Sequence, residues 1–451
     1  MVSSPSSHSF FKLLKNTVIA VSGDAGRKDF FTAKGLDINE GFKVLSGAIP
    51  MLPGVTSDLQ ARRITLIHKR LSAIQNSEHL SKLLPKIVGD ADRVIRSWQS
   101  GTLDPFDVIP KLCFQTTVRS LACSELADDE NIVARLKKLY DNLDSSTTPA
   151  SVLFPWFPSP SLISKLYSTK KIYDIVNRVI DQRIQSGIPQ DDTLQMLVDN
   201  ADDKLVILGF IMGLLVAGAR STGVTASWLI TFLGTHPHWK NQAYEEVREV
   251  LSSAYSDSDS DPKFTSSGFM TSKSATTASA LSTIPIDVWE NKMPVLDSLI
   301  RETLRIAQPH TAMRRNMGPD TFISGARVPS GAYVVYPFSD VHLNPELYPD
   351  PYRFDPGRPK HEMPFAYVGW GAGTTICLGQ RLARLQLKIM MSLMLLDTDF
   401  LIVDKTGSIP NPLPSPNWND ALTCRPPRDS CLLRFSRTEE DHQKYSPKAS
   451  C

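Results

Sequence analysis

The residues with the clearest chemical potential lie in a glycine-rich stretch, WGAGTTICLG, at positions 370–379. One cysteine, Cys377, follows the glycines, and a helical pattern of apolar residues begins directly after it. Glycines let the backbone pass close to a flat cofactor. A thiolate near a helix N-terminus is stabilised by the helix dipole and by free N–H groups. The pattern therefore predicts a cysteine that binds a metal; the alternative is a glycine-rich turn with a buried structural cysteine.

A second candidate motif is the pair Glu302 and Arg305, which lies on a stretch with a strong helical pattern. The i,i+3 spacing places both side chains on one side of a helix, where a carboxylate and a guanidinium can pair. Such a pair by itself usually marks a solvated salt bridge. Its position is more informative, because Arg305 precedes Cys377 by 72 residues.

The elements that must position these residues are predicted to be mainly helices. Apolar residues recur at three and four spacing from about residue 58 to 184, and the helical pattern returns at 202–250 and after Cys377, to about residue 396. Short strands are expected at 17–22, 327–328, 333–335 and 432–435. The sequence thus predicts a mainly α fold with a small β region.

Two segments interrupt this pattern. A proline-rich break, FPWFPSPS, separates two helices at 154–161. Residues 252–283 are rich in serine and threonine and include an SDSDSD run, a composition that buries little apolar surface. We interpret 252–283 as a flexible surface insertion, and residues 1–451 as one domain.

Composition limits the classes of function. The 451 residues carry a net charge of +2, which gives no reason to expect a nucleic-acid partner. The six cysteines are sparse and show no zinc-type pairing, so a reducing compartment is expected rather than a disulfide framework. No segment reaches the roughly 18–20 unbroken apolar residues of a membrane span. The longest apolar segment, 205–219, is expected to be a buried core helix.

With these motifs in this order, the chain resembles the cytochrome P450 family. The family signature is an aromatic residue, two alternate glycines and Cys-x-Gly, matched here by Trp370, Gly371, Gly373, Cys377 and Gly379. The resemblance implies the P450 fold and haem b bound between a central helix and the cysteine loop, with the Cys377 thiolate as axial ligand of the iron.

The resemblance also assigns roles to several charged residues. The pair Glu302–Arg305 would be buried and joined by a second arginine from the segment YPDPYRF, which offers Arg353, to form a structural triad. By family spacing, an arginine after this pair binds a haem propionate: Arg315 fits best and Arg314 is the alternative. The family commonly has a basic residue two before the cysteine, where this chain has Thr375.

The stretch 205–232 resembles the central helix that crosses the haem face, where Ala217 and Gly218 would leave room for dioxygen. The family continues with an acid or amide and then threonine, but this chain has Arg220, Ser221, Thr222 and Gly223. Ser221 and Thr222 are the candidate catalytic hydroxyls, either of which could bond back to the preceding turn. Thr222 is expected to matter more, because it precedes Gly223, where the helix could open.

The implied reaction is insertion of one atom of dioxygen into a lipophilic small molecule, with a terpenoid or similar substrate of fungal secondary metabolism expected by analogy. Electrons would come from NADPH-cytochrome P450 reductase, because no flavin or nicotinamide fingerprint is present. Two alternatives are a haem-binding relative without turnover and a haem-thiolate enzyme that uses peroxide or rearranges its substrate. By the same resemblance, the anchor and first helix of membrane-bound relatives are expected to be absent, either because the protein works without them or because the sequence is a truncated gene model. The protein is expected to be intracellular, with endoplasmic reticulum association by family analogy.

Overall fold

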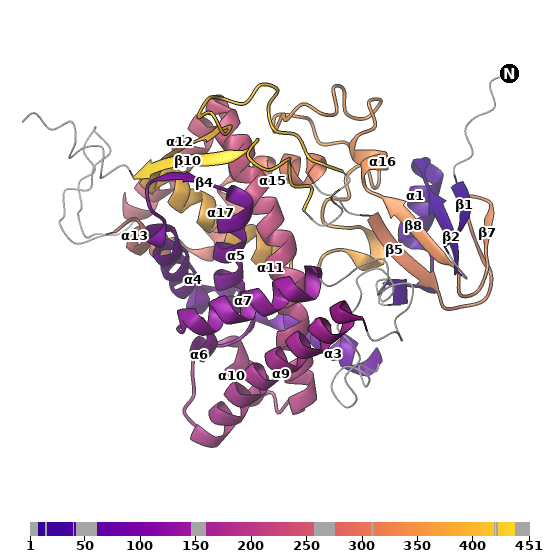
Figure 1. The fold of residues 1–451 in the computed structure, drawn as a ribbon, viewed down its shortest axis with the longest axis horizontal. Coiled ribbons are helices and arrows are strands. Elements are labelled where there is room, and N and C mark those ends of the chain that lie inside the picture. Colours follow the sequence, from indigo (N-terminus) through magenta and orange to yellow (C-terminus); the bar gives the residue numbers. More distant parts are fainter. Residues whose placement is uncertain are drawn as a thin grey trace, which may run out of the picture.

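The structure is a computed structural model that describes residues 8–13, 16–38, 40–41, 61–145, 159–256, 276–307, 311–418, 420 and 423–437. The described chain is mainly helical with small sheets, as the sequence predicted (Figure 1). The helices are α1 (Gly23–Thr32), α3 (Ala61–Ile74), α4 (Ser77–Ser97), α5 (Pro105–Leu121), α6 (Ser124–Ala127), α7 (Glu130–Ser145), α9 (Pro160–Ser186), α10 (Thr193–Asp199), α11 (Lys204–Thr235), α12 (Pro237–Ser256), α13 (Thr277–Thr283), α14 (Ile286–Asn291), α15 (Pro294–Ile306), α16 (Ser339–His342) and α17 (Gln380–Asp397), with a 3-10 turn η1 (Gly373–Thr375).

The strands of the described residues form three small sheets. They are β1 (His8–Leu13), β2 (Asn16–Val21), β3 (Leu36–Asp37), β4 (Gly101–Leu103), β5 (Thr311–Asn316), β6 (Thr321–Ile323), β7 (Ala326–Val328), β8 (Tyr333–Pro337), β9 (Thr398–Val403) and β10 (Leu432–Arg437). The largest sheet has the order β1-β2-β8-β5-β3, in which β2 and β8 pair in parallel and the other neighbours are antiparallel. Strands β2, β7, β8 and β10 confirm the four strands that the sequence predicted.

Helix α11 forms the centre of the helical part (Figure 1). It packs along α5 and also contacts α9, α15, α17 and β9. Asp203 caps its N-terminus by accepting a hydrogen bond from the Leu205 backbone N–H. It is the one helix in the described chain long and apolar enough to span a membrane, but its partners here are other elements of the fold. The predicted core helix at 205–232 is therefore confirmed.

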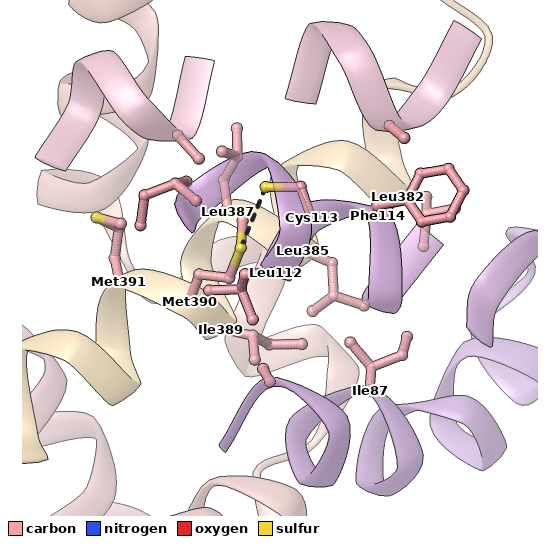
Figure 2. Close-up of a cluster of buried hydrophobic side chains, with 14 of the residues drawn as sticks. Ile87, Leu112, Cys113, Phe114, Leu382, Leu385, Leu387, Ile389, Met390 and Met391 are labelled. Carbon is pink, nitrogen blue, oxygen red and sulfur yellow. Dashed lines mark hydrogen bonds between the residues drawn. The ribbon is translucent and has the colours of Figure 1, made fainter. Parts of the chain in front are cut away.

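A dense apolar core surrounds the helix that follows the cysteine loop. Figure 2 shows side chains from α4, α5 and α17 packed together, among them Ile87, Leu112, Leu385 and Met390. The thiol of Cys113 contacts the Met390 sulfur at 3.5 Å and is fully buried. This packing fixes α17, and with it the residues directly after Cys377.

The prediction that 252–283 is a flexible insertion is wrong at both of its ends. Helix α12 continues to Ser256, and α13 occupies Thr277–Thr283 with Ala278, Ala280 and Leu281 buried against neighbouring helices. Thr276 caps α13 by accepting the Ser279 backbone N–H. Small side chains hid this contact surface from a hydrophobicity reading. Residues 257–275, and 154–158 of the proline-rich break, lie outside the described residues.

Candidate haem-thiolate site

The cysteine loop is closed by its own backbone. The Cys377 N–H donates to the Trp370 carbonyl oxygen at 2.6 Å, and between them η1 makes a tight turn. Gly371 and Gly373 have φ values of +74° and +59°, which L side chains rarely adopt. A Cβ on Gly371 would lie 2.7 Å from the Thr375 carbonyl oxygen, and one on Gly373 would collide with the Phe31 carbonyl. Glycine is therefore required at both positions by the shape of the loop.

Cys377 lies at the end of this loop, immediately before Gly379 begins the capping turn of α17. The residue is exposed, and its apolar neighbours Ile376 and Leu378 are also exposed, at 51% and 41%. Desolvation by the surrounding protein nevertheless raises the pKa of the Cys377 thiol, although a hydrogen bond from the Gly379 backbone N–H lowers it. The thiol is therefore partly desolvated and has one backbone donor. A metal ion bound there would supply the charge that stabilises the thiolate.

Arg314 and Arg315 lie on opposite faces of β5, and the structure corrects the expected choice between them. Arg314 is 1% exposed and donates to the Phe30 carbonyl and to Thr375 Oγ1 in the cysteine loop. Arg315 instead lies over Tyr333 and forms a 3.8 Å ion pair with Glu40. Successive side chains of a strand alternate in direction, so only one of the two can reach the loop. Arg314 is the better candidate to bind a propionate.

The buried Arg314 guanidinium has an unusual environment. It stacks on Phe30 and Phe31, and among the described residues no carboxylate lies within ion-pair distance. Burial lowers the pKa of Arg314 to about 10. A buried cation without an anionic partner is costly, and an anionic group beside the cysteine loop would offset that cost. Thr375, which replaces the usual basic residue, is instead a hydrogen-bond partner of Arg314.

We expect Arg314→Gln to weaken cofactor retention by about 10-fold to 100-fold, because one charge-assisted hydrogen bond contributes about 1.5–3 kcal/mol. The free energy of unfolding of the cofactor-free protein should change little, because the variant loses hydrogen bonds of the guanidinium but also removes the cost of a buried cation. Cofactor transfer to apomyoglobin measures retention. Arg315→Gln, on the same strand, is the matched control and should retain cofactor like the parent. Equally weakened cofactor retention in both variants would contradict the assignment of Arg314 as the propionate-binding residue.

The predicted pair Glu302 and Arg305 is buried, at 4% and 2% exposed. Arg305 binds Glu302 through two parallel hydrogen bonds, each 2.8 Å long. The side chain of the expected third member, Arg353, is not part of this cluster, because it is 63% exposed and pairs with Asp355. Only the Arg353 backbone carbonyl contacts the cluster, by accepting hydrogen bonds from Arg305 and Arg358. Arg358 takes that position and donates to Glu302 Oε1 at 3.1 Å. The prediction of Arg353 is therefore wrong, because the loop turns its side chain outward.

This cluster, Glu302–Arg305–Arg358, is connected to the cysteine loop through His342. Arg305 donates to the His342 carbonyl oxygen at 2.7 Å, and the His342 ring accepts the Val368 backbone N–H at 3.0 Å, two residues before Trp370. Burial, with a smaller contribution from Arg305, lowers the pKa of His342 to about 3, so the ring stays neutral and can accept this bond. Sequence reasoning missed His342 and Arg358, since neither belongs to a local motif.

Helix α11 places Ser221 and Thr222 differently from the expectation. Ser221 and Ala217, one turn apart, are the two exposed residues of this fully described helix, whereas Thr222 is 5% exposed. Ser221 Oγ bonds back to the Ala217 carbonyl at 2.9 Å, one of the two back-bonds that the sequence allowed. The helix is not interrupted at Gly223, which packs against Pro110. The Ser221 hydroxyl is accessible on this helix and the Thr222 hydroxyl is buried, so Ser221 replaces Thr222 as the better candidate.

These elements define a class of protein: a mainly helical fold with a cysteine presented at the N-terminus of a late helix, beside a buried arginine and a Glu–Arg–Arg cluster. The cytochrome P450 family model matches residues 82–263 and 287–432, more than half of the chain. The chain therefore belongs to the cytochrome P450 family, and it is an oxidoreductase of the P450 monooxygenase class.

Named relatives agree with this placement. The cytochrome P450 monooxygenase AacuE of Aspergillus aculeatus is 29% identical, covering 90% of this chain and 81% of its own length. The human lanosterol 14-alpha demethylase is 26% identical, covering 87% and 74%. Among solved structures, retinoic acid bound cyanobacterial CYP120A1 has a TM-score of 0.70 at 21% identity, covering 96% of this chain and 92% of that chain. This structural likeness supports the fold alone.

The family implies haem with a cysteine thiolate ligand, and the residues present fit that group. The cysteine loop offers one thiol and no other metal ligand, and in the described chain no cluster of three histidine, cysteine or carboxylate side chains could hold a metal instead. Arg314 lies beside the loop without a carboxylate partner among the described residues, and its cation suits an anionic substituent. The exposed apolar side chains of Ile376 and Leu378 suit a flat apolar ring.

Proposed function

We propose that this chain is a haem-thiolate monooxygenase in which the Cys377 thiolate would bind the haem iron, and which transfers one atom of dioxygen to a lipophilic small molecule. The observation that carries the proposal is the closed glycine loop that presents Cys377 beside the buried Arg314, which has no carboxylate partner in the part of the chain that the structure describes. When bound, the cofactor supplies the oxidative chemistry, and the protein positions and protects the reacting groups.

The chain's own residues would perform the remaining tasks. Arg314 would bind a propionate, with Thr375 Oγ1 holding the guanidinium in place. On α11, Ala217 leaves space because of its small side chain, and the Ser221 hydroxyl is available to move a proton at the exposed face of the helix. Arg220 cannot serve as the proton donor, because a guanidinium stays charged at ordinary pH.

For the substrate class, we propose a lipophilic polycyclic compound, such as a terpenoid of fungal secondary metabolism. Support comes from relatives that are P450 monooxygenases of fungi and from lanosterol 14-alpha demethylases, which are named for a sterol substrate. We further propose NADPH-cytochrome P450 reductase as electron donor, and endoplasmic reticulum association by the same analogy.

A second candidate is a haem-thiolate enzyme that uses peroxide or rearranges an oxygenated substrate. Arg220 favours it, because the family's acid at this position is replaced by a cation. The two reactions differ in their electron source. Product formed with NADPH and reductase, but not with peroxide alone, supports the monooxygenase; the opposite result supports the alternative. A relative without turnover would form product under neither condition.

We expect Ser221→Ala to reduce product formed per NADPH consumed by on the order of 10-fold and to increase peroxide release. A positioned proton donor typically contributes about 10²–10⁴-fold, and water can replace part of this. Thr222→Ala is the adjacent control and should couple almost like the parent, because Thr222 is buried. A larger loss in Thr222→Ala would show that the helix opens as the sequence first suggested.

A further inference from the structure

A buried glutamine from the α3–α4 connection reaches the residues directly after Cys377. Gln75 is 6% exposed and lies more than 300 positions from the cysteine in sequence. Its side-chain nitrogen donates to the Leu378 carbonyl at 2.7 Å and to the Leu71 carbonyl at 2.9 Å. Its side-chain oxygen accepts the Leu382 backbone N–H at 3.1 Å. Both donor hydrogens and the acceptor of this amide are therefore used.

The Leu382 bond explains how α17 begins. Leu382 is the third residue of the helix, so its N–H has no partner within the helix. The capping position is Gly379, which has no side chain that could accept this hydrogen bond. Gln75 supplies that acceptor from another part of the fold. Arg381 adds a second connection, since it donates to the Gln75 carbonyl oxygen and pairs with Glu290.

The hydrogen bond from Gln75 to the Leu378 carbonyl affects the peptide group that contacts the Cys377 sulfur. The Leu378 carbonyl and the Gly379 N–H belong to one peptide group, which is planar and trans, so they point in opposite directions. Gln75 donates to the carbonyl on one side, and the Gly379 N–H donates to the Cys377 sulfur on the other. A hydrogen bond to the carbonyl fixes the plane of the peptide and polarises it, which makes its N–H a stronger donor.

We propose that Gln75 is a positioning residue for the thiolate ligand, acting through the peptide group between Leu378 and Gly379. This inference rests on the proposed role of Cys377 as axial ligand. Hydrogen bonds to a ligand sulfur raise the reduction potential of the metal by stabilising the more negative state, and second-shell partners orient the ligand. Gln75 thereby tunes a metal centre that its own side chain does not touch.

The test compares Gln75→Leu with Gln115→Leu. Gln115 is the matched control: it is 3% exposed, and its side chain donates to the Ala127 carbonyl at 2.7 Å, on α5 and away from the cysteine loop. Gln115→Leu leaves one carbonyl without its donor, whereas Gln75→Leu leaves two carbonyls without a donor and the Leu382 N–H without an acceptor, so both variants should lower the melting temperature. Only Gln75→Leu should lower the reduction potential, shift the iron–sulfur stretching frequency and weaken cofactor retention, the last by about 10-fold.

A folded Gln75→Leu protein with the parent's reduction potential and iron–sulfur frequency would overturn the proposal and leave Gln75 a purely structural residue. If Gln75→Leu does not fold, Gln75→Asn is the alternative variant, because its amide is too short to bond to both Leu378 and Leu382. The reduction potential and the iron–sulfur frequency of that variant then test the proposal in the same way. Failure of the underlying assignment looks different: Cys377→Ser would then retain the thiolate spectrum, whatever Gln75 does.

Discussion

Cys377→Ser is expected to abolish the red-shifted Soret band that thiolate ligation gives to the reduced, carbon monoxide-bound protein. A serine hydroxyl in the same loop does not provide the soft, electron-rich sulfur that this band requires. The loop is held by the Cys377 N–H bond to the Trp370 carbonyl and by its glycines, none of which involves the sulfur. We therefore expect a folded protein that lacks the band completely.

The matched control is Cys113→Ser, which also exchanges sulfur for oxygen. Cys113 is fully buried and contacts Met390, so this variant should lose stability but keep the band. Difference spectra of the reduced protein, recorded beside circular dichroism melting curves, separate the two effects. An unchanged band in Cys377→Ser, or a band lost from folded Cys113→Ser, would show that a different residue ligates the iron.

Glu302→Ala is expected to yield little soluble, haem-loaded protein. Its carboxylate accepts hydrogen bonds from Arg305, Arg358 and the Asp355 backbone N–H, so its removal leaves two largely buried guanidinium groups without their counter-charge. Removing one partner from a buried charge network costs about 3–5 kcal/mol. That is a large part of a free energy of unfolding of roughly 5–15 kcal/mol.

The comparison of Arg358→Ala with Arg353→Ala tests the corrected cluster. The Arg358 side chain is 11% exposed and donates to Glu302, whereas the Arg353 side chain is 63% exposed and pairs only with Asp355 among the salt bridges of the described chain. Urea unfolding should show a clearly lower free energy of unfolding for Arg358→Ala and little measurable change for Arg353→Ala, because solvent screens exposed ion pairs. Equal losses would restore Arg353 to the cluster.

Local patterns explain why much of the site could be predicted. The glycine loop and Cys377 are contiguous, and Glu302 and Arg305 are three residues apart on one helix, so chain geometry alone brings each set together. The long apolar stretch of α11 is equally predictable as a helix, because a helix of this composition must avoid water, in a protein core or in a membrane. These predictions depend on interactions within about four residues, which a sequence displays directly.

The choices between neighbouring residues could not be made in the same way. The choice between Arg314 and Arg315 depends on which face of β5 meets the cysteine loop. The choice between Ser221 and Thr222 depends on how α11 is rotated about its axis. Adjacent positions point about 180° apart on a strand and about 100° apart on a helix. A sequence fixes these angles relative to each other but not relative to the rest of the fold.

By itself, then, the sequence determined the family, the mainly helical fold and the identity of the candidate ligand, because contiguous residues and short repeats carry that information. The tertiary structure alone decided which arginine completes the Glu302 cluster and which arginine reaches the cysteine loop. It also placed Gln75 more than 300 positions from Cys377 in sequence yet against the peptide group next to it. Such long-range contacts depend on how complete elements pack, and no local spacing encodes that packing.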